Sequence, residues 1–318
     1  MIAFIFPGQG SQTVGMGKAL AEAFAEARAA FTEADTAFAA AADGTPGPGR
    51  SLRQLCFEGP EDQLTLTEHT QPAILAVSIA AARVLEARGV RPHFVAGHSL
   101  GEYSANVAAG TFAFADAVGI VRRRGRYMQE AVPPGRGAMA AILGLDAAEV
   151  GRACEEAAGG DAVSPANING PGQIVIAGAA AAVERAGARA KALGAKRVVP
   201  LAVSAPFHCA LMQPAEARLE PELRALAVRD PRVPIVANVD AQPKRDARAA
   251  IDALVRQVSA PVLWEDVVRR LASEGVTTYV EVGPGRVLGG LVKKIHRDAR
   301  ILAFAESDDL AEILASAK

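Results

Sequence analysis

Residues 97–101 of this 318-residue chain read Gly-His-Ser-Leu-Gly and fit the pattern G-x-S-x-G. This pattern is typical of a sharp turn between a strand and a helix that presents a serine hydroxyl at the end of an α/β sheet. The flanking residues favour that context, with a short buried strand at His93–Ala96, a helix at Tyr103–Ala109 and Gly110 at the helix end. A side chain on either motif glycine would block so tight a turn. The motif therefore predicts an α/β fold with Ser99 as a nucleophile.

Strand and helix patterns alternate along the chain and divide it into two parts. We expect a discontinuous catalytic core with a parallel sheet over residues 1–132 and 203–318, and a small inserted subdomain over residues 133–202. In the insertion the predicted order is strand–helix–strand–strand–helix–strand, which is the ferredoxin-like arrangement. One helical pattern covers residues 16–42, and a surface loop rich in glycine and proline is expected over residues 43–50. A cleft between the two parts is the expected ligand site.

Composition restricts the partners and the compartment. The net charge is −1, which gives no indication of a nucleic-acid-binding surface. No stretch approaches the ~20 uninterrupted apolar residues of a membrane span, and the apolar segment Met1–Phe6 lacks the basic region of a signal peptide. The chain has only three cysteines, and this small, odd number argues against a disulfide framework and favours a reducing compartment. We therefore expect a cytoplasmic protein that binds neither nucleic acid nor membranes.

A serine hydroxyl attacks only with a general base within hydrogen-bond reach. Five histidines are available for that role: His69, His93, His98, His208 and His296. His98 adjoins the serine, so that its side chain should point away from the position of a base. His208 follows the last strand of the insertion, at a junction that faces the expected cleft. Position alone makes His208 a candidate, and a packed or surface imidazole stays open for it.

Arg124 stands out within the basic run at residues 122–126 because it shares a helical stripe with apolar residues. A guanidinium on an apolar face is costly unless a carboxylate of the protein or of a ligand pairs with it. Its planar fork suits bidentate binding of a carboxylate. For Arg122, Arg123 and Arg126 we expect a solvated basic face instead.

Several motifs occur together and in a fixed order. They are Phe6-Pro7-Gly8-Gln9-Gly10-Ser11-Gln12, Thr70–Ala73, Gly97-His98-Ser99-Leu100-Gly101-Glu102, Asn167–Gly172, Pro206-Phe207-His208-Cys209, Arg256-Gln257 and Glu281–Gly285. In this combination the chain resembles, over nearly its whole length, the malonyl-CoA:acyl carrier protein transacylases and the related acyltransferase domains of polyketide synthases. The resemblance implies an α/β-hydrolase-like core domain with an inserted ferredoxin-like subdomain, in agreement with the pattern of elements.

The resemblance also implies a reaction, in which a malonyl group passes from malonyl-CoA to the phosphopantetheine thiol of an acyl carrier protein in a ping-pong route. Ser99 would be the nucleophile and His208 its base. The backbone carbonyl of Gln257, rather than an aspartate, would orient the histidine, which departs from the Ser-His-Asp template. Arg124 would bind the free carboxylate of the malonyl group. No metal and no cofactor are implied, because the coenzyme A thioester is a substrate.

The remaining site residues come from the same resemblance. The backbone N–H groups of Gln9 and Leu100 would form the oxyanion hole. Four residues match family positions near the pocket: Phe207, Gln71, Asn167 and Asn169. The bulky Phe207 would narrow the acyl pocket in favour of malonyl, with plain packing as its alternative. For the other three, a turn or capping role stays open.

Three functions compete at this stage. The first is malonyl transfer, with a stand-alone polyketide-synthase acyltransferase of another acyl preference as a variant. The second is a hydrolase that releases acyl groups from carriers, and the third is a non-catalytic docking protein. Carrier proteins of this family are acidic, so a basic rim is expected from charge alone, although scattered surface charge explains the same residues: Lys191, Lys196, Arg197, Lys293 and Lys294. A monomer is the state that the resemblance implies.

Overall fold

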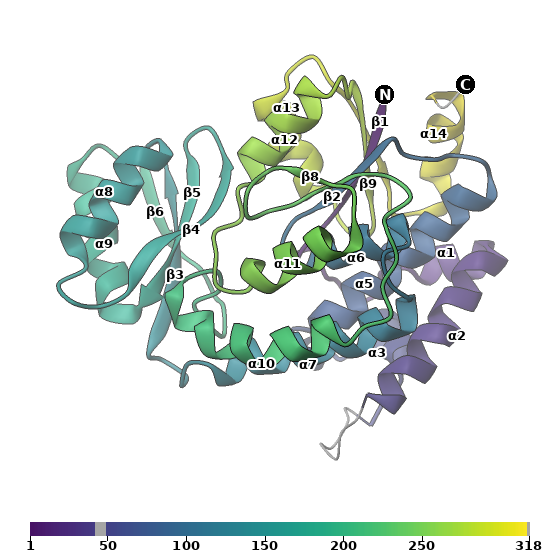
Figure 1. The fold of residues 1–318 in the computed structure, drawn as a ribbon, viewed down its shortest axis with the longest axis horizontal. Helices are drawn as coiled ribbons and strands as arrows, with labels where there is room; N and C mark the ends of the chain where they lie inside the picture. Colours follow the sequence, from purple (N-terminus) through teal and green to yellow (C-terminus); the bar gives the residue numbers. More distant parts are fainter. Residues whose placement is uncertain (42–48, 317–318) are drawn as a thin grey trace.

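The computed structural model describes residues 1–41 and 49–316, and it contains two separate sheets (Figure 1). The larger sheet has six strands in the order β10-β9-β1-β2-β7-β8. Its strands are β1 (Ile2–Phe6), β2 (Phe94–Gly97), β7 (Ile235–Val236), β8 (Pro243–Lys244), β9 (Thr278–Val282) and β10 (Arg300–Phe304). The predicted α/β class is therefore confirmed.

The larger sheet is mixed rather than wholly parallel, which corrects the prediction. Every pair from β10 to β7 is parallel, but β8 runs antiparallel to β7. Only residues 237–242 join these two strands, and Ala241 turns the chain with a φ of 52°. A parallel neighbour would need a crossover of a dozen or more residues, so this short connection can only return as a hairpin.

Helices cover both faces of the larger sheet. Successive residues of β1 point to opposite faces, with Phe4 and Phe6 in one apolar cluster and Ala3 and Ile5 in another. The first cluster contains side chains of most helices of the core: α1 (Lys18–Ala23), α2 (Ala25–Ala40), α3 (Leu52–Glu58), α4 (Glu61–Leu64), α5 (Thr67–Ala87), α6 (Leu100–Ala109), α7 (Phe114–Glu130), α10 (Gln213–Arg224), α11 (Ala247–Gln257) and α14 (Leu310–Ser316). The second cluster contains α12 (Trp264–Ser273) and α13 (Val287–Ile295). Burial on both faces explains why β1 reads as a continuous apolar run.

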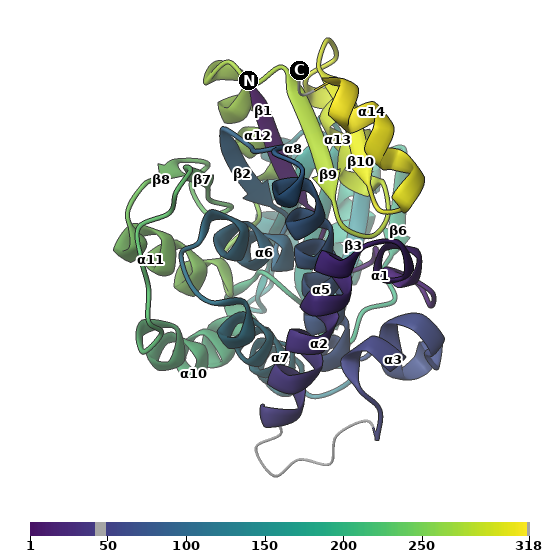
Figure 2. The same ribbon diagram turned by 90° about the vertical axis from the view of Figure 1, so that its right-hand side faces the viewer.

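The helical pattern over residues 16–42 is divided in the structure. Phe24 has an extended backbone, with φ −126° and ψ 131°, and separates α1 from α2. The predicted loop over residues 43–50 lies mostly outside the described residues. No helix among the described residues is both long and apolar enough to span a bilayer. Figures 1 and 2 show both chain termini at the same end of the larger sheet.

The smaller sheet comes from one continuous piece of the chain. Its elements are β3 (Gly137–Leu143), α8 (Ala147–Ala157), β4 (Val163–Gly170), β5 (Gln173–Ala179), α9 (Ala180–Ala192) and β6 (Arg197–Pro200). The strands pair antiparallel in the order β4-β5-β3-β6, and α8 and α9 pack on one face. This is the predicted ferredoxin-like order. The exact division of the chain at residues 132/133 and 202/203 stays a prediction.

Main-chain hydrogen bonds join the small sheet to the core. The N–H of Ile168 donates to the carbonyl of Val262, and the N–H of Val262 donates to the carbonyl of Ala166, both at 2.9 Å. These bonds form a short parallel bridge between β4 and the segment before α12. The small sheet is therefore held beside the carboxyl ends of the parallel strands, where α/β proteins bind their ligands.

Candidate active site

Ser99 lies in the turn between β2 and α6, as its motif predicts. Its backbone has φ 51° and ψ −106°, a conformation that non-glycine residues adopt rarely. A Cβ on Gly97 would come within 2.0 Å of the backbone of Gly101, and one on Gly101 within 2.0 Å of the Phe6 carbonyl oxygen. Both motif glycines are therefore required by contact with neighbouring backbone, and the strained turn exposes the serine hydroxyl to the cleft.

His208 is the histidine that meets the serine. Its Nε2 lies 2.7 Å from Ser99 Oγ, and its Nδ1 donates to the backbone carbonyl of Gln257 at 2.9 Å. This hydrogen bond places the proton on Nδ1, so that Nε2 can accept the hydroxyl proton. Burial, followed by the nearby Arg124 cation, lowers the pKa of His208 to about 3. The imidazole is therefore neutral near pH 7, as a general base must be.

Arg124 is fully enclosed beside the serine, with 1% of its surface exposed. One terminal nitrogen donates to Gln71 Oε1 at 2.7 Å, and the other donates to Gln257 Oε1 at 2.9 Å and to Ser99 Oγ at 3.1 Å. Its Nε is buried without a partner among the described residues. All three acceptors are neutral, so that the cation keeps its capacity to bind an anionic group next to the nucleophile.

The two proposed oxyanion donors lie on either side of the serine. Gln9 is in the loop after β1, and Leu100 is the first residue of α6. No described residue accepts a hydrogen bond from either backbone N–H. The glycine before Gln9 packs tightly on the turn, since a Cβ on Gly8 would lie 2.5 Å from the carbonyl oxygen of His98. A larger residue at that position would push the loop away from the serine.

A cavity of about 390 Å³ lies between the larger sheet and the small one and is lined by Gln9, Ser99, Arg124 and His208. Among the other predicted residues, Gln71, Asn167 and Phe207 also line it. Asn169 is not among the lining residues, but its Oδ1 lies 2.8 Å from Nε2 of His98. His98 also lines the cavity, and its Nε2 links the Ser99 turn to the small sheet.

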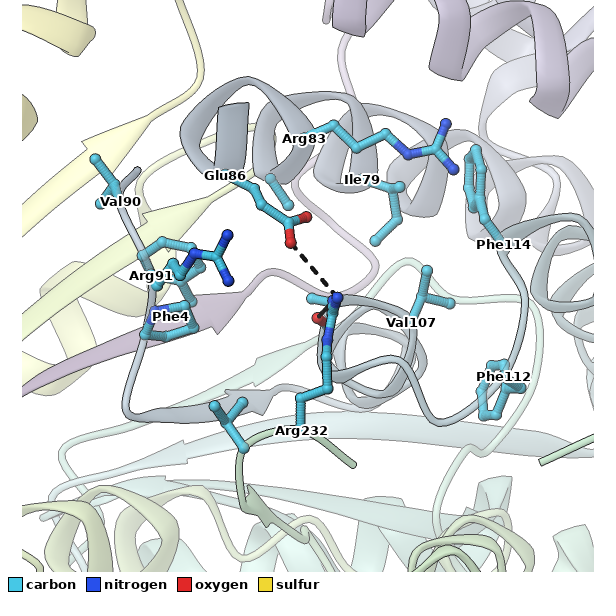
Figure 3. A pocket seen from close by; sticks show the side chains of 14 residues that line it. Phe4, Ile79, Arg83, Glu86, Val90, Arg91, Val107, Phe112, Phe114 and Arg232 are labelled. Carbon is cyan, nitrogen blue, oxygen red and sulfur yellow. Dashed lines mark hydrogen bonds and ion pairs between the residues drawn. The ribbon is translucent and has the colours of Figure 1, made fainter. Parts of the chain in front are cut away.

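A second cavity, of about 370 Å³, lies at the far end of α6 from Ser99. Figure 3 shows an ion pair between Arg232 and Glu86, 3.5 Å apart, that spans this cavity above an apolar lining that includes Phe4 and Phe112. Among the described residues that line it there is no serine, histidine or cysteine. Ser99 and His208 line the first cavity and not the second.

The prediction of a solvated basic face is wrong for Arg122. This side chain is 4% exposed, donates to the carbonyl of Phe38 at 2.9 Å and covers the Phe38 ring. The helix α7 packs against α2 there, and the long side chain finds its partners across that contact. Arg123 pairs with Glu222, and Arg126 is partly exposed beside Glu130.

Sequence reasoning missed two polar residues behind the serine. Asn238 follows β7, accepts from the backbone N–H of Ser99 at 2.8 Å and donates to the carbonyl of Gly97 at 2.7 Å. Glu102 is 1% exposed and accepts from the backbone N–H of Asn238 at 3.1 Å. The carboxyl ends of parallel strands meet at one edge of a sheet. The position of Asn238 just after a strand adjacent to β2 could therefore have predicted that it lies near Ser99.

An α/β sheet with a serine at a strand–helix turn, facing a histidine, is typical of enzymes that transfer or hydrolyse acyl groups. Comparison with known proteins identifies the family. The model of the acyl transferase domain matches residues 3–307, and this chain belongs to that family.

Three relatives show what the chain is similar to. The malonyl CoA-acyl carrier protein transacylase of Escherichia coli (strain K12) is 50% identical and covers 98% of each chain. The structure of an acyl carrier protein S-malonyltransferase from Vibrio cholerae is 45% identical, with a TM-score of 0.93 over 98% of this chain and 99% of that one. A malonyl-transacylase solved in complex with a type II polyketide acyl-carrier protein has a TM-score of 0.93 and 46% identity over 99% of each chain.

Proposed function

We propose that this chain transfers a malonyl group from malonyl-CoA to the phosphopantetheine thiol of an acyl carrier protein, through a malonyl ester on Ser99. The observation that carries the proposal is the position of one buried cation. Arg124 donates to the same Ser99 Oγ that lies 2.7 Å from His208 Nε2. An acyl group attached to that oxygen would therefore have its free carboxylate within reach of a guanidinium.

The first half-reaction forms the serine ester. His208 Nε2 takes the hydroxyl proton while Ser99 Oγ attacks the thioester carbonyl. The negative charge that develops on the carbonyl oxygen is stabilised by the backbone N–H groups of Gln9 and Leu100. Collapse of the tetrahedral intermediate breaks the carbon–sulfur bond, and the imidazolium returns its proton to the departing thiolate of coenzyme A. The carbonyl of Gln257 holds the imidazolium in place while it carries the charge.

The second half-reaction reverses these steps with another thiol. His208 deprotonates the phosphopantetheine thiol, the thiolate attacks the malonyl ester, and Ser99 regains its proton. Throughout, Arg124 binds the malonyl carboxylate through its fork of donors. An acetyl group offers no carboxylate, so the cation favours the diacid half-ester.

The carrier would approach the cleft over basic side chains of the small sheet and of α13. Lys196 and Lys294 are exposed, and Lys294 donates to Gln173 Oε1 at the start of β5. The relative solved with an acyl-carrier protein supports a carrier of this class. The three described cysteines are free and buried, which fits the cytoplasm as the compartment we propose. A monomeric state stays a prediction.

Intact-mass spectrometry tests the proposal directly. After mixing with malonyl-CoA, the wild-type chain should gain one malonyl group, and Ser99→Ala should gain none. Ser104→Ala is the matched control, because Ser104 is buried on the same helix and is remote from the cavity lining. This variant should be acylated like the wild type.

The acylated chain should then lose its adduct to an added phosphopantetheinyl carrier, with little free malonate. An adduct that persists in Ser99→Ala would contradict the role of the serine. Release of malonate faster than transfer would identify a hydrolase, and preference for another acyl group would identify a polyketide-type acyltransferase. Folded protein with neither acylation nor turnover would be a docking protein.

A further inference from the structure

Arg124 is a buried cation without a direct ion pair among the described residues. A charge taken out of water is costly unless something compensates it. The nearby carboxylate that acts on the Arg124 guanidinium is Glu102, but one residue separates the two groups. That residue is Gln257, whose side-chain Nε2 donates to Glu102 Oε2 at 2.8 Å while its Oε1 accepts from Arg124 at 2.9 Å.

Gln257 joins four groups of the site at once. Besides Glu102 and Arg124, its Nε2 donates to the backbone carbonyl of Ser99 at 2.9 Å. Its own backbone carbonyl accepts from His208 Nδ1 at 2.9 Å. The side chain of this one residue therefore holds the cation and the Ser99 turn, and its backbone carbonyl holds the base.

Glu102 helps to set the orientation of the Gln257 side-chain amide. An amide can be placed either way round, and the fixed donors and acceptors around it select one of the two. Here these are the Arg124 donor, the Ser99 carbonyl and Glu102 Oε2. Glu102 Oε2 is the charged acceptor among them, and it is itself held by the backbone N–H of Asn238. An ionised carboxylate can accept hydrogen bonds but cannot donate one. Glu102 therefore presents no donor that could favour the reversed amide of Gln257.

We propose that Glu102 is a positioning residue for malonyl transfer, which acts through the side chain of Gln257 to orient Arg124 and the Ser99 turn and to compensate the charge of Arg124 from a distance. This inference rests on the proposed function. A carboxylate in direct contact with Arg124 would occupy the donors that the malonyl carboxylate needs. Separation by one amide keeps those donors available while the negative charge stays near the cation.

The arrangement makes the reaction sensitive to the ionisation of Glu102. Burial raises the pKa of Glu102 to about 7, against the opposing effect of its hydrogen bonds from Gln257 and Asn238. The charged and titratable groups around it are Arg124 on α7, Asp240 after β7 and Tyr103 on its own helix. His208 is neutral far below this range, so an acid limb near pH 7 belongs to Glu102. Protonation of Glu102 removes the compensating charge, and the rate falls as the pH falls.

Glu102→Gln tests the inference, because it removes the charge with little change in volume and keeps one acceptor oxygen. Its matched control is Glu281→Gln. Glu281 is also fully buried, accepts two backbone N–H bonds, from Leu288 and Gly289, and lies outside the cavity lining. We expect kcat for malonyl transfer to fall on the order of tenfold in Glu102→Gln without a rise in the KM for malonyl-CoA. The control should keep its kcat within about twofold.

The pH profile supplies a readout that a purely structural role would not change. In the wild type, kcat/KM should rise through an ionisation near pH 7. In Glu102→Gln this ionisation should be absent, so that the profile is flat between about pH 6 and about pH 8. The same acid limb in the variant, or equal losses in the two glutamate variants, would overturn the inference.

Two further measurements keep the test decisive if Glu102→Gln does not fold. If the pH profile of kcat/KM for the wild type shows no acid limb near pH 7, that result alone overturns the inference. Gln257→Leu keeps the backbone carbonyl but removes the amide link, and it should lose kcat and the acid limb in the same way. Failure of the wild type to form a malonyl adduct would refute the proposed function instead. Normal acylation with an unchanged Glu102→Gln profile would refute only the role of Glu102.

Discussion

Replacement of Arg124 by alanine should change which thioester the enzyme prefers. Loss of one partner from a buried, hydrogen-bonded charge pair costs about 2–5 kcal/mol. In the free protein Arg124 already donates to three neutral oxygens, so it is not left without partners when an acetyl group binds. The lower part of that range, about 2–3.5 kcal/mol, therefore applies, and it corresponds to about 30-fold to 400-fold in kcat/KM.

The measurement is the ratio of kcat/KM for malonyl-CoA to that for acetyl-CoA. Both rates should fall in Arg124→Ala, because the variant also loses the hydrogen bond to Ser99 Oγ. The ratio isolates the contact with the malonyl carboxylate, which the acetyl group does not make. Arg124→Lys keeps the charge without the fork and should give an intermediate ratio. A ratio equal to that of the wild type, in protein with a normal thermal transition, would refute the reasoning.

Three other predictions concern stability, acyl choice and the carrier. Because burial lowers the pKa of His208 to about 3, the unfolded chain binds this proton first as the pH falls. The contribution of His208 to folding stability should decrease below about pH 6.5 by up to about 1.4 kcal/mol per pH unit, so the stability difference between the wild type and His208→Gln should change with that slope in urea titrations; parallel pH profiles of the two proteins would contradict it. Phe207→Ala should raise the use of methylmalonyl-CoA relative to malonyl-CoA about tenfold, measured as a kcat/KM ratio, and an unchanged ratio would assign Phe207 to packing. Lys196→Glu and Lys294→Glu should weaken use of the carrier in low salt, with Lys18→Glu on α1 as control; a loss that persists in high salt would exclude an electrostatic contact.

Local patterns predicted the parts of the site that depend on neighbouring residues. The glycines around Ser99 indicated a tight turn, and the structure shows the backbone contacts that exclude any side chain there. The apolar stripe around Arg124 indicated a buried guanidinium, and it is buried. The same reasoning did not reach Arg122, because its partner Phe38 is 84 residues away in the sequence.

The choice of base was beyond any local pattern. Ser99 and His208 are 109 positions apart, and residue type alone left five histidines open. Resemblance to a family singled out His208 and Gln257, and the described geometry brings both to the serine. The contacts of the Gln257 side chain, Glu102 and Asn238 were not predicted, although Glu102 and Gln257 fall within the quoted motifs, since each looks like an ordinary polar residue of a helix end or a loop.

The sequence by itself therefore determined the strand–turn–helix at Ser99, the alternation of the core and the order of the inserted elements, because these depend on steric limits and on periodicity within a few residues. Only the tertiary structure decided which polar groups meet, and it does so by bringing the ends of β1, β2 and β7 to one edge with the small sheet beside them. Hydrogen bonds between groups 49 to 155 residues apart depend on how the whole core packs, so that the network of Glu102, Gln257, Arg124 and His208 exists only in the folded chain.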